Sequence, residues 1–386
     1  MTDPIIQGWC PGALRPMMSG DGLVVRVRPK EGRLSSAQLS EIARLSIEHG
    51  NGLIDFSNRA NVQLRGVTQG SHGPLIDGLR AINLIDPDPE TESRRNIIVS
   101  PLWADGDGTR RVAQHLMAML EAADDLALPG KFGFAVDLAG PPVLGDIASD
   151  IRIERDGNFA LIRPDGSQHA MRVPIEKAAE SAIRLAYWFV MTGGATEGRG
   201  RMRAHMKRHG VELPSAFNHV ITPWDKTPMP KPGLHDLGTF VGFEFGQARA
   251  EIVSNLAKFA DFFRISPWQM ILLEGQHALP EIDGVITNPN DPMRRVVACT
   301  GAPGCPQALQ PTRDLARALA PNVPAGKTLH VSGCTKGCAR ASECDVVLVA
   351  QTTGFGLVKQ GRASDTPLLS GITADALRSS SDIWGK

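Results

Sequence analysis

Residues 299–305 read Cys299-Thr-Gly-Ala-Pro-Gly-Cys305, and residues 334–338 read Cys334-Thr-Lys-Gly-Cys338. Both cysteine pairs lie in glycine-rich loops, where the backbone can turn tightly enough for two sulfur atoms to point at one centre. Thiolates are ligands for soft metals, and this pattern favours a 4Fe-4S cluster held by Cys299, Cys305, Cys334 and Cys338.

Three other interpretations of these cysteines remain, and each fits less well. Structural zinc prefers pairs separated by about two to four residues, whereas Cys299 and Cys305 are further apart. A disulfide framework is typical of secreted domains rather than long intracellular chains. Buried thiols acting as small apolar side chains would not be expected in polar glycine loops. Cys10 and Cys344 lie outside the pairs, and we expect them to be ordinary buried thiols rather than further ligands.

The composition indicates a globular protein with more than one domain. The chain has 386 residues, with 41 basic and 41 acidic side chains. This balance leaves no overall field that would attract nucleic acid or a membrane surface. The sequence contains neither a basic leader nor the roughly 20 consecutive apolar residues of a membrane span. We therefore expect a cytoplasmic protein with no nucleic-acid or membrane partner, which binds any anionic ligand through local groups of charges.

Periodicity near the start predicts a strand, a helix and a longer extended segment. Leu23 to Arg28 alternate in the manner of a strand. The segment Leu34-Ser35-Ser36 is predicted to cap a helix that continues to about His49. After the turn at Asn51 and Gly52, residues 53–65 are predicted to be extended, with polar side chains alternating with apolar ones.

The same order of elements recurs later in the chain. Phe240 to Phe245 is predicted to be a strand, Ala248 to Phe263 a helix, and Arg264 to Leu273 an extended run. The segment FSNRANVQLRG of the first unit then corresponds to RISPWQMILLEG of the second. Two such halves could pair about a pseudo-twofold axis and share one ligand, although chance similarity would give the same weak repeat.

The rest of the chain alternates between predicted helices and strands, with a proline-rich linker from Pro223 to Pro232. This pattern predicts an α+β protein. The helices are expected at about 109–123 and 175–191. A turn followed by a strand is expected within 128–137, and further strands at about 151–155, 159–163 and 346–350.

The motifs, taken together, resemble the nitrite and sulfite reductase family. The two cysteine motifs, ACTGAPGCPQA and GCTKGCAR, follow the two ferredoxin-like repeats. Four further motifs come before the cysteine motifs in an order similar to that of the family: VVRVR, SNRANVQLRG, RRNIIVSPL and LPGKFGF. Members of that family hold a 4Fe-4S cluster beside a sirohaem. The resemblance implies two ferredoxin-like half-domains related by a pseudo-twofold and two larger α+β domains, with the cluster in the C-terminal one. The expected bounds are 1–80 and 223–285 for the half-domains, the latter with its linker, and 90–222 and 286–386 for the larger domains.

One branch of the family resembles this sequence more than the others. The opening WCPGALRPMMSGDGLVVRVRP and the motif GCTKGCA are similar to those of the precorrin-3B synthases, monooxygenases of aerobic cobalamin biosynthesis. That resemblance implies hydroxylation of precorrin-3A at C20 with O2, and closure of a γ-lactone by the ring-A acetate. No Gly-x-Gly-x-x-Gly fingerprint follows a strand, so we expect an external NADH-linked electron donor.

The resemblance also implies an anion site. In the reductases two arginines and two lysines surround the substrate anion, and their positions correspond here to Arg26, Arg95, Lys131 and Gly133. The missing lysine weakens the case for sulfite or nitrite reduction, which needs dense positive charge. Lys336 replaces an asparagine that lies near the sirohaem in the relatives. A permanently bound sirohaem is therefore expected only under the reductase alternative.

Sirohaem and precorrin-3A both carry eight acetate and propionate carboxylates. Guanidinium and amide groups bind carboxylates well, which makes Arg59, Gln63 and Arg65 candidate tetrapyrrole ligands. They occupy alternate positions of one predicted extended face, and a solvated strand face is the alternative.

Some features stay open at this stage. Dioxygen chemistry commonly needs a metal or flavin, so an additional non-haem iron is possible, but the sequence does not locate it. His205 and His209 are spaced to share an ion on a helix, although a solvated basic helix is favoured. A non-catalytic carrier of a cluster or tetrapyrrole is the third functional candidate, beside the monooxygenase and the reductase.

Overall fold

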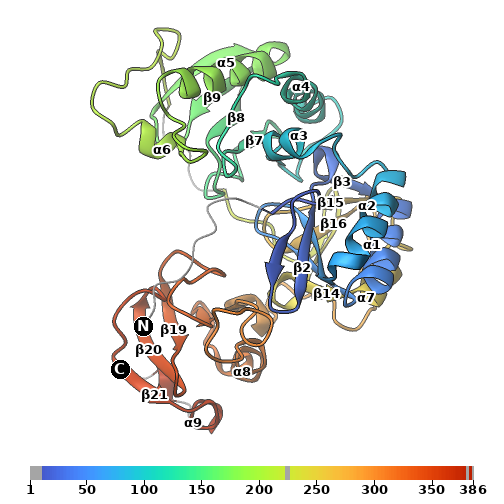
Figure 1. Ribbon diagram of the computed structural model, residues 1–386, viewed down its shortest axis with the longest axis vertical. Helices are drawn as coiled ribbons and strands as arrows, with labels where there is room; N and C mark the ends of the chain where they lie inside the picture. The colour runs from blue at the N-terminus through green and yellow to red at the C-terminus, as the bar shows by residue number, and fades with distance from the viewer. Residues whose placement is uncertain (1–10, 222–226, 380–381, 385–386) are drawn as a thin grey trace.

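The computed structural model describes residues 11–221, 227–379 and 382–384. It contains three lobes (Figure 1). The central lobe consists of two five-stranded sheets packed together. The middle of the sequence forms a second lobe around a six-stranded sheet, called the middle lobe below, and the C-terminal part forms a cysteine lobe around another five-stranded sheet. Cys10 and part of the predicted proline-rich linker lie outside the described residues.

The first half-sheet has the strand order β1-β2-β5-β4-β14 and is antiparallel throughout. Its strands, in that order, are Met17–Ser19, Gly22–Val27, Val62–Val67, Leu53–Phe56 and Gln247–Arg249.

The second half-sheet has the matching order β12-β13-β16-β15-β3. Its strands, in that order, are Gly233–His235, Gly238–Gly242, Met270–Glu274, Phe262–Ile265 and Arg33–Ser35.

The two half-sheets exchange their edge strands. β14 comes from the second repeat but pairs with β4, and β3 comes from the first repeat but pairs with β15. The left-handed turn residues also match, since Ala60 and Gln269 have φ of 54° and 59°. This correspondence confirms the predicted pseudo-twofold repeat.

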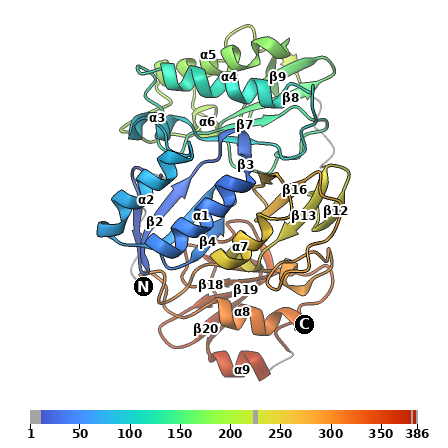
Figure 2. The ribbon, with the colours of Figure 1, turned by 90° about the vertical axis from the view of Figure 1, so that its right-hand side faces the viewer.

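Three helices cover one side of both half-sheets (Figure 2). They are α1 Ser36–His49, α2 Gln69–Ala81 and α7 Ala250–Leu256. Ser35 caps α1 as predicted, because its side chain accepts a hydrogen bond from the backbone of Gln38 while the Gln38 side chain binds the Ser35 backbone.

Two predicted elements differ from the structure. Residues 53–65 form two strands, because Ser57 Oγ accepts the backbone N–H groups of Arg59 and Asn61 and closes a turn between β4 and β5. The helix predicted to end at Phe263 ends at Leu256. Phe262 and Phe263 instead pair with Ser35 and Leu34 of the exchanged strand β3, so tertiary pairing overrides local helix propensity.

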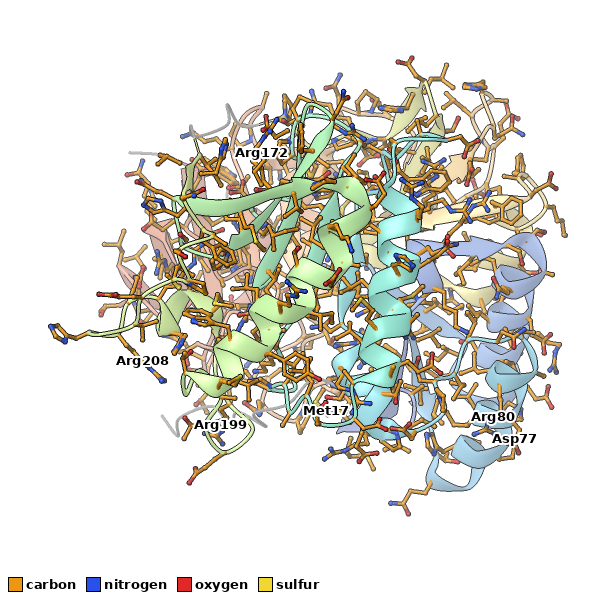
Figure 3. All side chains as sticks on the ribbon, turned by 90° about the horizontal axis from the view of Figure 1, so that it is seen from above. Met17, Asp77, Arg80, Arg172, Arg199 and Arg208 are labelled. Carbon is orange, nitrogen blue, oxygen red and sulfur yellow. The ribbon has the colours of Figure 1, made fainter. Side chains whose placement is uncertain are left out.

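The middle lobe has a mixed sheet of order β11-β10-β9-β8-β7-β6, in which β6, β7 and β8 are parallel. The strands are His219–Val220, His169–Pro174, Phe159–Pro164, Ile151–Asp156, Phe134–Asp137 and Ile97–Val99. α4 Thr109–Ala122 and α5 Ala178–Met191 lie side by side over it (Figure 3). The short helices α3 Pro89–Arg94 and α6 Met202–His205 complete this lobe.

The cysteine lobe has the order β17-β18-β19-β20-β21, and its first three strands are parallel. The strands are Val296–Ala298, Leu329–Ser332, Cys344–Ala350, Phe355–Gly361 and Leu369–Ile372. The helices are α8 Arg313–Leu319 and α9 Ala374–Ser379. Both cysteine pairs begin just after the carboxyl ends of neighbouring parallel strands, which brings the two loops to the same edge of the sheet.

Candidate functional site

The side of the first half-sheet that faces away from the helices is polar. Apolar side chains such as Val25 and Leu64 point into the helix-covered core, so the alternate positions face the other way. There Arg26 donates from Nε and Nη2 to Gln63 Oε1 at 3.0 and 2.7 Å. Gln63 Nε2 donates to Asp55 at 3.4 Å, and Arg65 Nη1 donates to the same carboxylate at 3.2 Å. The structure thus brings three predicted site residues, Arg26, Gln63 and Arg65, into one network.

Arg59 lies in the turn between β4 and β5, so it does not share a strand face with Gln63 and Arg65 as predicted. Its guanidinium instead lies beside Gly133 of the middle lobe. A Cβ on Gly133 would lie 3.0 Å from Arg59 Nη2 and 2.7 Å from Asn96 Nδ2. Asn96 is held there because Nδ2 donates to the Phe132 carbonyl at 2.8 Å. A side chain at Gly133 would have to displace the Arg59 guanidinium and the Asn96 amide.

Lys131 is in the turn just before Gly133 and is partly exposed. Among the described residues, no hydrogen bond or ion pair to its ammonium group is found. Lys131 therefore carries a positive charge without a fixed counterion from the described part of the chain.

Arg95 has a different environment. It forms a buried two-pronged ion pair with Asp86, with N to O distances of 2.6 and 2.8 Å. Neighbouring Arg28 is also buried, and burial lowers its pKa to about 10. Glu92 opposes that lowering, whereas the charges of Arg26 and Arg95 add to it. These three arginines are thus close together, but Asp86 already neutralises Arg95.

The cysteine loops fit the ligand set of an iron–sulfur cluster. Cys299 Sγ accepts the backbone N–H of Gly333 at 3.1 Å, which links the two loops through a bond to sulfur. Burial raises the pKa of the Cys338 thiol; Lys336 acts against this, and the charges of Cys334, Cys299 and Cys305 raise it further. As thiolates, the other three cysteines would therefore repel Cys338. Iron bound between them would relieve that repulsion.

No set of three or more His, Cys, Asp or Glu side chains in the described ranges is arranged to hold a single metal ion. This result does not conflict with a cluster, because cluster cysteines bind different iron atoms and stand further apart. Cys344 is not part of the group. It is buried in β19 and donates to Thr328 Oγ1 at 3.1 Å.

The first half-sheet is in direct contact with the cysteine lobe. Ser19 Oγ donates to the Gly304 carbonyl at 2.8 Å, and the Gly20 N–H donates to the same oxygen at 3.1 Å. Arg65 Nη2 donates in turn to Ser19 Oγ at 3.2 Å. One hydroxyl group therefore separates a predicted carboxylate ligand from the Cys299–Cys305 loop.

A second route joins the same two regions, and sequence analysis missed all three of its residues. Gln247 Nε2 donates to Asp55 Oδ1 at 2.6 Å, and Arg313 Nη1 donates to Gln247 Oε1. No local motif marks Gln247, because it reaches this face only through the exchange of β14 between the halves. Asp55 could have been found, since it alternates with the apolar residues of β4.

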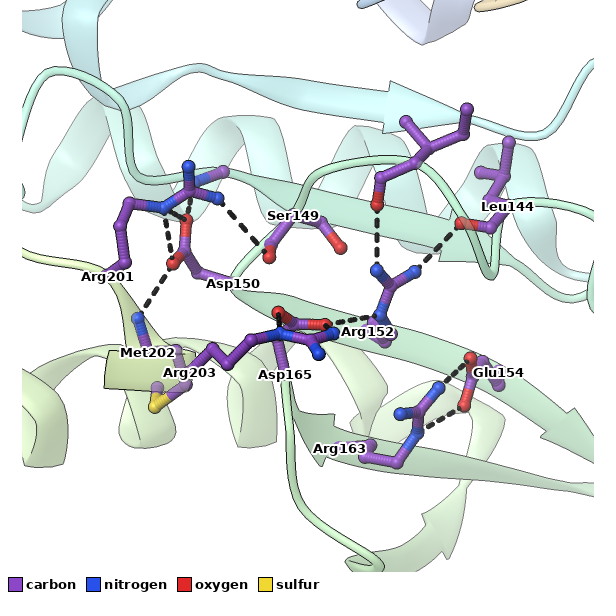
Figure 4. A network of polar contacts seen from close by, with 12 residues as sticks. Leu144, Ser149, Asp150, Arg152, Glu154, Arg163, Asp165, Arg201, Met202 and Arg203 are labelled. Carbon is purple, nitrogen blue, oxygen red and sulfur yellow. Dashed lines mark hydrogen bonds and ion pairs between the residues drawn. The ribbon is translucent and has the colours of Figure 1, made fainter. Parts of the chain in front are cut away.

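The other conspicuous group of charges lies in the middle lobe and is structural (Figure 4). Arg152 and Arg203 share the carboxylate of Asp165 at 3.1 and 2.9 Å, while Arg201 pairs with Asp150 at 2.9 Å. Each of these cations already has its counterion. Arg199 and Arg208 project from the rim of this lobe (Figure 3).

The prediction that His205 lies on a solvated helix is wrong. His205 is 1% exposed and packs edge-on against Trp188 and Phe189. Its Nε2 is 2.8 Å from Thr192 Oγ1. α6 ends at His205, so His209 does not share a helix face with it.

Among the described helices, none has the length and apolar character needed to cross a membrane.

Comparisons with known proteins agree with this architecture. Residues 15–82 match the nitrite/sulfite reductase ferredoxin-like half domain. The solved structure of the NirA protein of Mycobacterium tuberculosis superposes with a TM-score of 0.65 at 18% identity, covering 92% of this chain and 79% of that one. The chain therefore has the nitrite/sulfite reductase-like fold.

Similar proteins of known name indicate which members of this fold class the chain resembles. Precorrin-3B synthase of a Sinorhizobium species is 27% identical over 395 residues, which covers 94% of this chain and 84% of that protein. Ferredoxin–nitrite reductase of Synechococcus elongatus is 25% identical, covering 87% of this chain and 77% of that protein. The second of these relatives is a reductase by name. The predicted resemblance to precorrin-3B synthase, within the nitrite and sulfite reductase-like proteins, is confirmed.

Proposed function

We propose that this protein is a precorrin-3B synthase, a monooxygenase that hydroxylates precorrin-3A at C20 and forms the ring-A γ-lactone. The observation that carries the proposal is the packing around Gly133, where any side chain would have to displace Arg59 and Asn96; this packing speaks against the second lysine expected of an anion-reducing site. The similarity to precorrin-3B synthase over 94% of the chain supports the same choice.

The polar side of the first half-sheet suits the substrate. Precorrin-3A has a fringe of eight carboxylates, and forked guanidinium groups bind carboxylates through paired hydrogen bonds. Arg26, Arg59 and Arg65 are assigned to this role, with the Gln63 amide between two of them. Arg65 is 5% exposed and already satisfied by Asp21 and Asp55, so we expect it to reorganise when a substrate carboxylate arrives.

Cys299, Cys305, Cys334 and Cys338 would hold the 4Fe-4S cluster, which supplies electrons one at a time when bound. Lys336, in the Cys334–Cys338 loop, is assigned to the side of the tetrapyrrole. Lys131 and Arg26 place positive charge beside the substrate, where charge on oxygen would develop. Arg95 is assigned to hold Asp86 and the neighbouring backbone in place.

The overall reaction balances with an external donor. One oxygen atom of O2 enters the substrate and the other leaves as water, which requires two electrons and two protons. We assign their supply to an NADH-linked reductase. The ring-A acetate of the substrate serves as the nucleophile that closes the lactone. The described residues do not locate a site for the additional non-haem iron considered above.

The specific observation that favours a second function, sirohaem-dependent nitrite or sulfite reduction, is the similarity to ferredoxin–nitrite reductases. A non-catalytic carrier of the cluster or tetrapyrrole is the third. The first experiment is therefore anaerobic purification, followed by iron and acid-labile sulfide analysis and extraction of any bound sirohaem.

We expect about four irons and four sulfides per chain, as for one such cluster, with no sirohaem. The protein should then convert precorrin-3A under air, with NADH and a reductase, into a product that has gained one oxygen atom. Stoichiometric sirohaem with nitrite or sulfite turnover would overturn the proposal in favour of the reductase. Tetrapyrrole binding without oxygen-dependent turnover would favour the carrier.

A further inference from the structure

A continuous chain of hydrogen bonds runs from the polar side of the first half-sheet to the cysteine lobe. Arg26 donates to Gln63, Gln63 to Asp55, Gln247 to Asp55, and Arg313 to Gln247. Asp55 is the branch point, because Oδ2 accepts from both Gln63 and Arg65 while Oδ1 accepts from Gln247. The two ends of this chain are a predicted substrate ligand and a cation of the cysteine lobe.

Arg313 reaches the neighbourhood of the cluster ligands. It begins helix α8, and the preceding residue, Thr312, donates its hydroxyl to the Cys299 carbonyl at 2.7 Å. Burial lowers the pKa of Arg313, and the charge of Asp55 opposes this; the charges of Arg65 and then Cys299 also act on it. Arg313 is thus in electrostatic contact with the polar network and with a cluster ligand.

Asp55 can exchange one cation for another. Arg65 and Arg313 both act on its carboxylate, Arg65 directly and Arg313 through Gln247. If substrate carboxylates engage both Arg65 and Arg26, these two cations are drawn away from Asp55. Arg313 remains linked to Asp55 through Gln247, and Asp55 then draws it away from Cys299.

We propose that the Asp55–Gln247–Arg313 link couples occupancy of the tetrapyrrole site to the reduction potential of the cluster. Binding of a polycarboxylate tetrapyrrole shifts the positive charge of Arg313 toward the sheet and lowers the potential. By linkage the effect is reciprocal: the reduced protein binds the tetrapyrrole more weakly. A tenfold difference in affinity corresponds to about 59 mV for a one-electron couple. This inference rests on the proposed tetrapyrrole site.

The test measures the midpoint potential and the electron paramagnetic resonance spectrum of the cluster under anaerobic conditions, so that no turnover occurs. Each is recorded with and without precorrin-3A, and with uroporphyrin III as a stable, metal-free octacarboxylate probe. The variant Gln247→Leu removes both hydrogen bonds of the link. Gln247→Asn keeps the amide but shortens it, and serves if the leucine variant fails to assemble a cluster.

The matched control is Gln310→Leu. Gln310 also lies beside the cysteine loop, since its carbonyl accepts the Ala302 N–H at 3.1 Å, but its side chain bonds within the cysteine lobe. A direct field from the bound carboxylates would act equally on every variant. Only the contribution of the link is lost with Gln247.

We expect the ligand to lower the potential in the unaltered protein and in the Gln310→Leu control, and to lose more than half of that shift in both Gln247 variants. An undiminished shift in the Gln247 variants would overturn the link while leaving the proposed function intact. Absence of binding of either tetrapyrrole to the unaltered protein would overturn the proposed function and the link together.

Discussion

The two half-sheets have the same strand order, but the side chains on the face away from the helices differ in character. Strand register sets the correspondence of their side chains on the face away from the helices. The equivalent pairs are Arg26 and Phe240, Gln63 and Leu272, Asp55 and Arg264, Arg65 and Glu274, and Gln247 and Arg33. The five residues of the first half form a polar network. At the equivalent places the second half presents two apolar side chains and two arginines, Arg264 and Arg33, that both pair with Glu274, so the polarity of the ion pair is reversed.

The second half is closed by the protein itself. Phe240, Met270 and Leu272 form a buried cluster against Leu102 of the middle lobe. The Arg264 guanidinium lies 3.4 Å from the ring centroid of Trp103 and donates to the Pro101 and Trp103 carbonyls. This arrangement binds the middle lobe to the sheet. The comparison teaches that the second half-sheet uses this face to bind the middle lobe, whereas the first half-sheet keeps it polar; it is this polar face that we assign to a ligand.

The largest effect on stability should come from removing a buried side chain of the second half. Phe240 is fully buried, so Phe240→Ala is expected to lower the free energy of unfolding by about 3–5 kcal/mol through lost burial and a residual cavity. Urea unfolding followed by tryptophan fluorescence measures the change. A loss below about 1 kcal/mol would show that this face is not a structural interface, and the comparison would fail.

The equivalent change in the first half should affect ligand binding instead. Arg26→Ala is expected to weaken binding of uroporphyrin III by about 10- to 100-fold, the range for loss of hydrogen bonds to a charged group. Its free energy of unfolding should change by no more than about 1 kcal/mol, since the side chain is only partly buried. Equilibrium titration of the tetrapyrrole absorbance gives the affinity. Unchanged affinity would remove Arg26 from the site.

Sequence reasoning could predict these two halves only in part. The period-two pattern of Leu23 to Arg28 and the cap at Ser35 are local signals, and both were confirmed. Strand exchange is not local, so neither the pairing of Gln247 with Asp55 nor the early end of α7 could be predicted. Arg59 shows the same limit: its alternation with Gln63 predicted a common strand face, but a hydroxyl of Ser57 closes a turn there. The motifs located the cysteine loops because glycine and cysteine spacing carries the chemistry directly.

A smaller effect on stability is expected at Gly133. This glycine leaves room for Arg59 of the first half, whose equivalent in the second half is Trp268. Gly133→Ala should cost about 1–3 kcal/mol of unfolding free energy, because the added methyl group meets Arg59 and Asn96 at less than normal contact distance. Gly145→Ala is the matched control, since nothing lies within 4 Å of its Cβ position. Equal stability of the two variants would mean that Gly133 is not enclosed, and a lysine could then be accommodated there.

The smallest effect is expected in the pH dependence of stability, and it concerns the ion pair between Glu274 and Arg264 in the second half. Burial acts to raise the pKa of Glu274, but hydrogen bonds from Arg264 and Arg33 outweigh it, so the pKa lies below its usual value of 4.5. The unfolded chain then binds the proton first as the pH falls. The stabilisation from Glu274 is therefore present above about pH 4.5 and is lost as the pH falls through the lower, folded-state pKa. In Glu274→Gln this contribution is absent, so its stability should depend less on pH between about 5 and 3 than that of the unaltered protein. Urea midpoints measured across that range check this, and parallel curves for the two proteins would show that the second-half ion pair does not contribute to holding the lobes together.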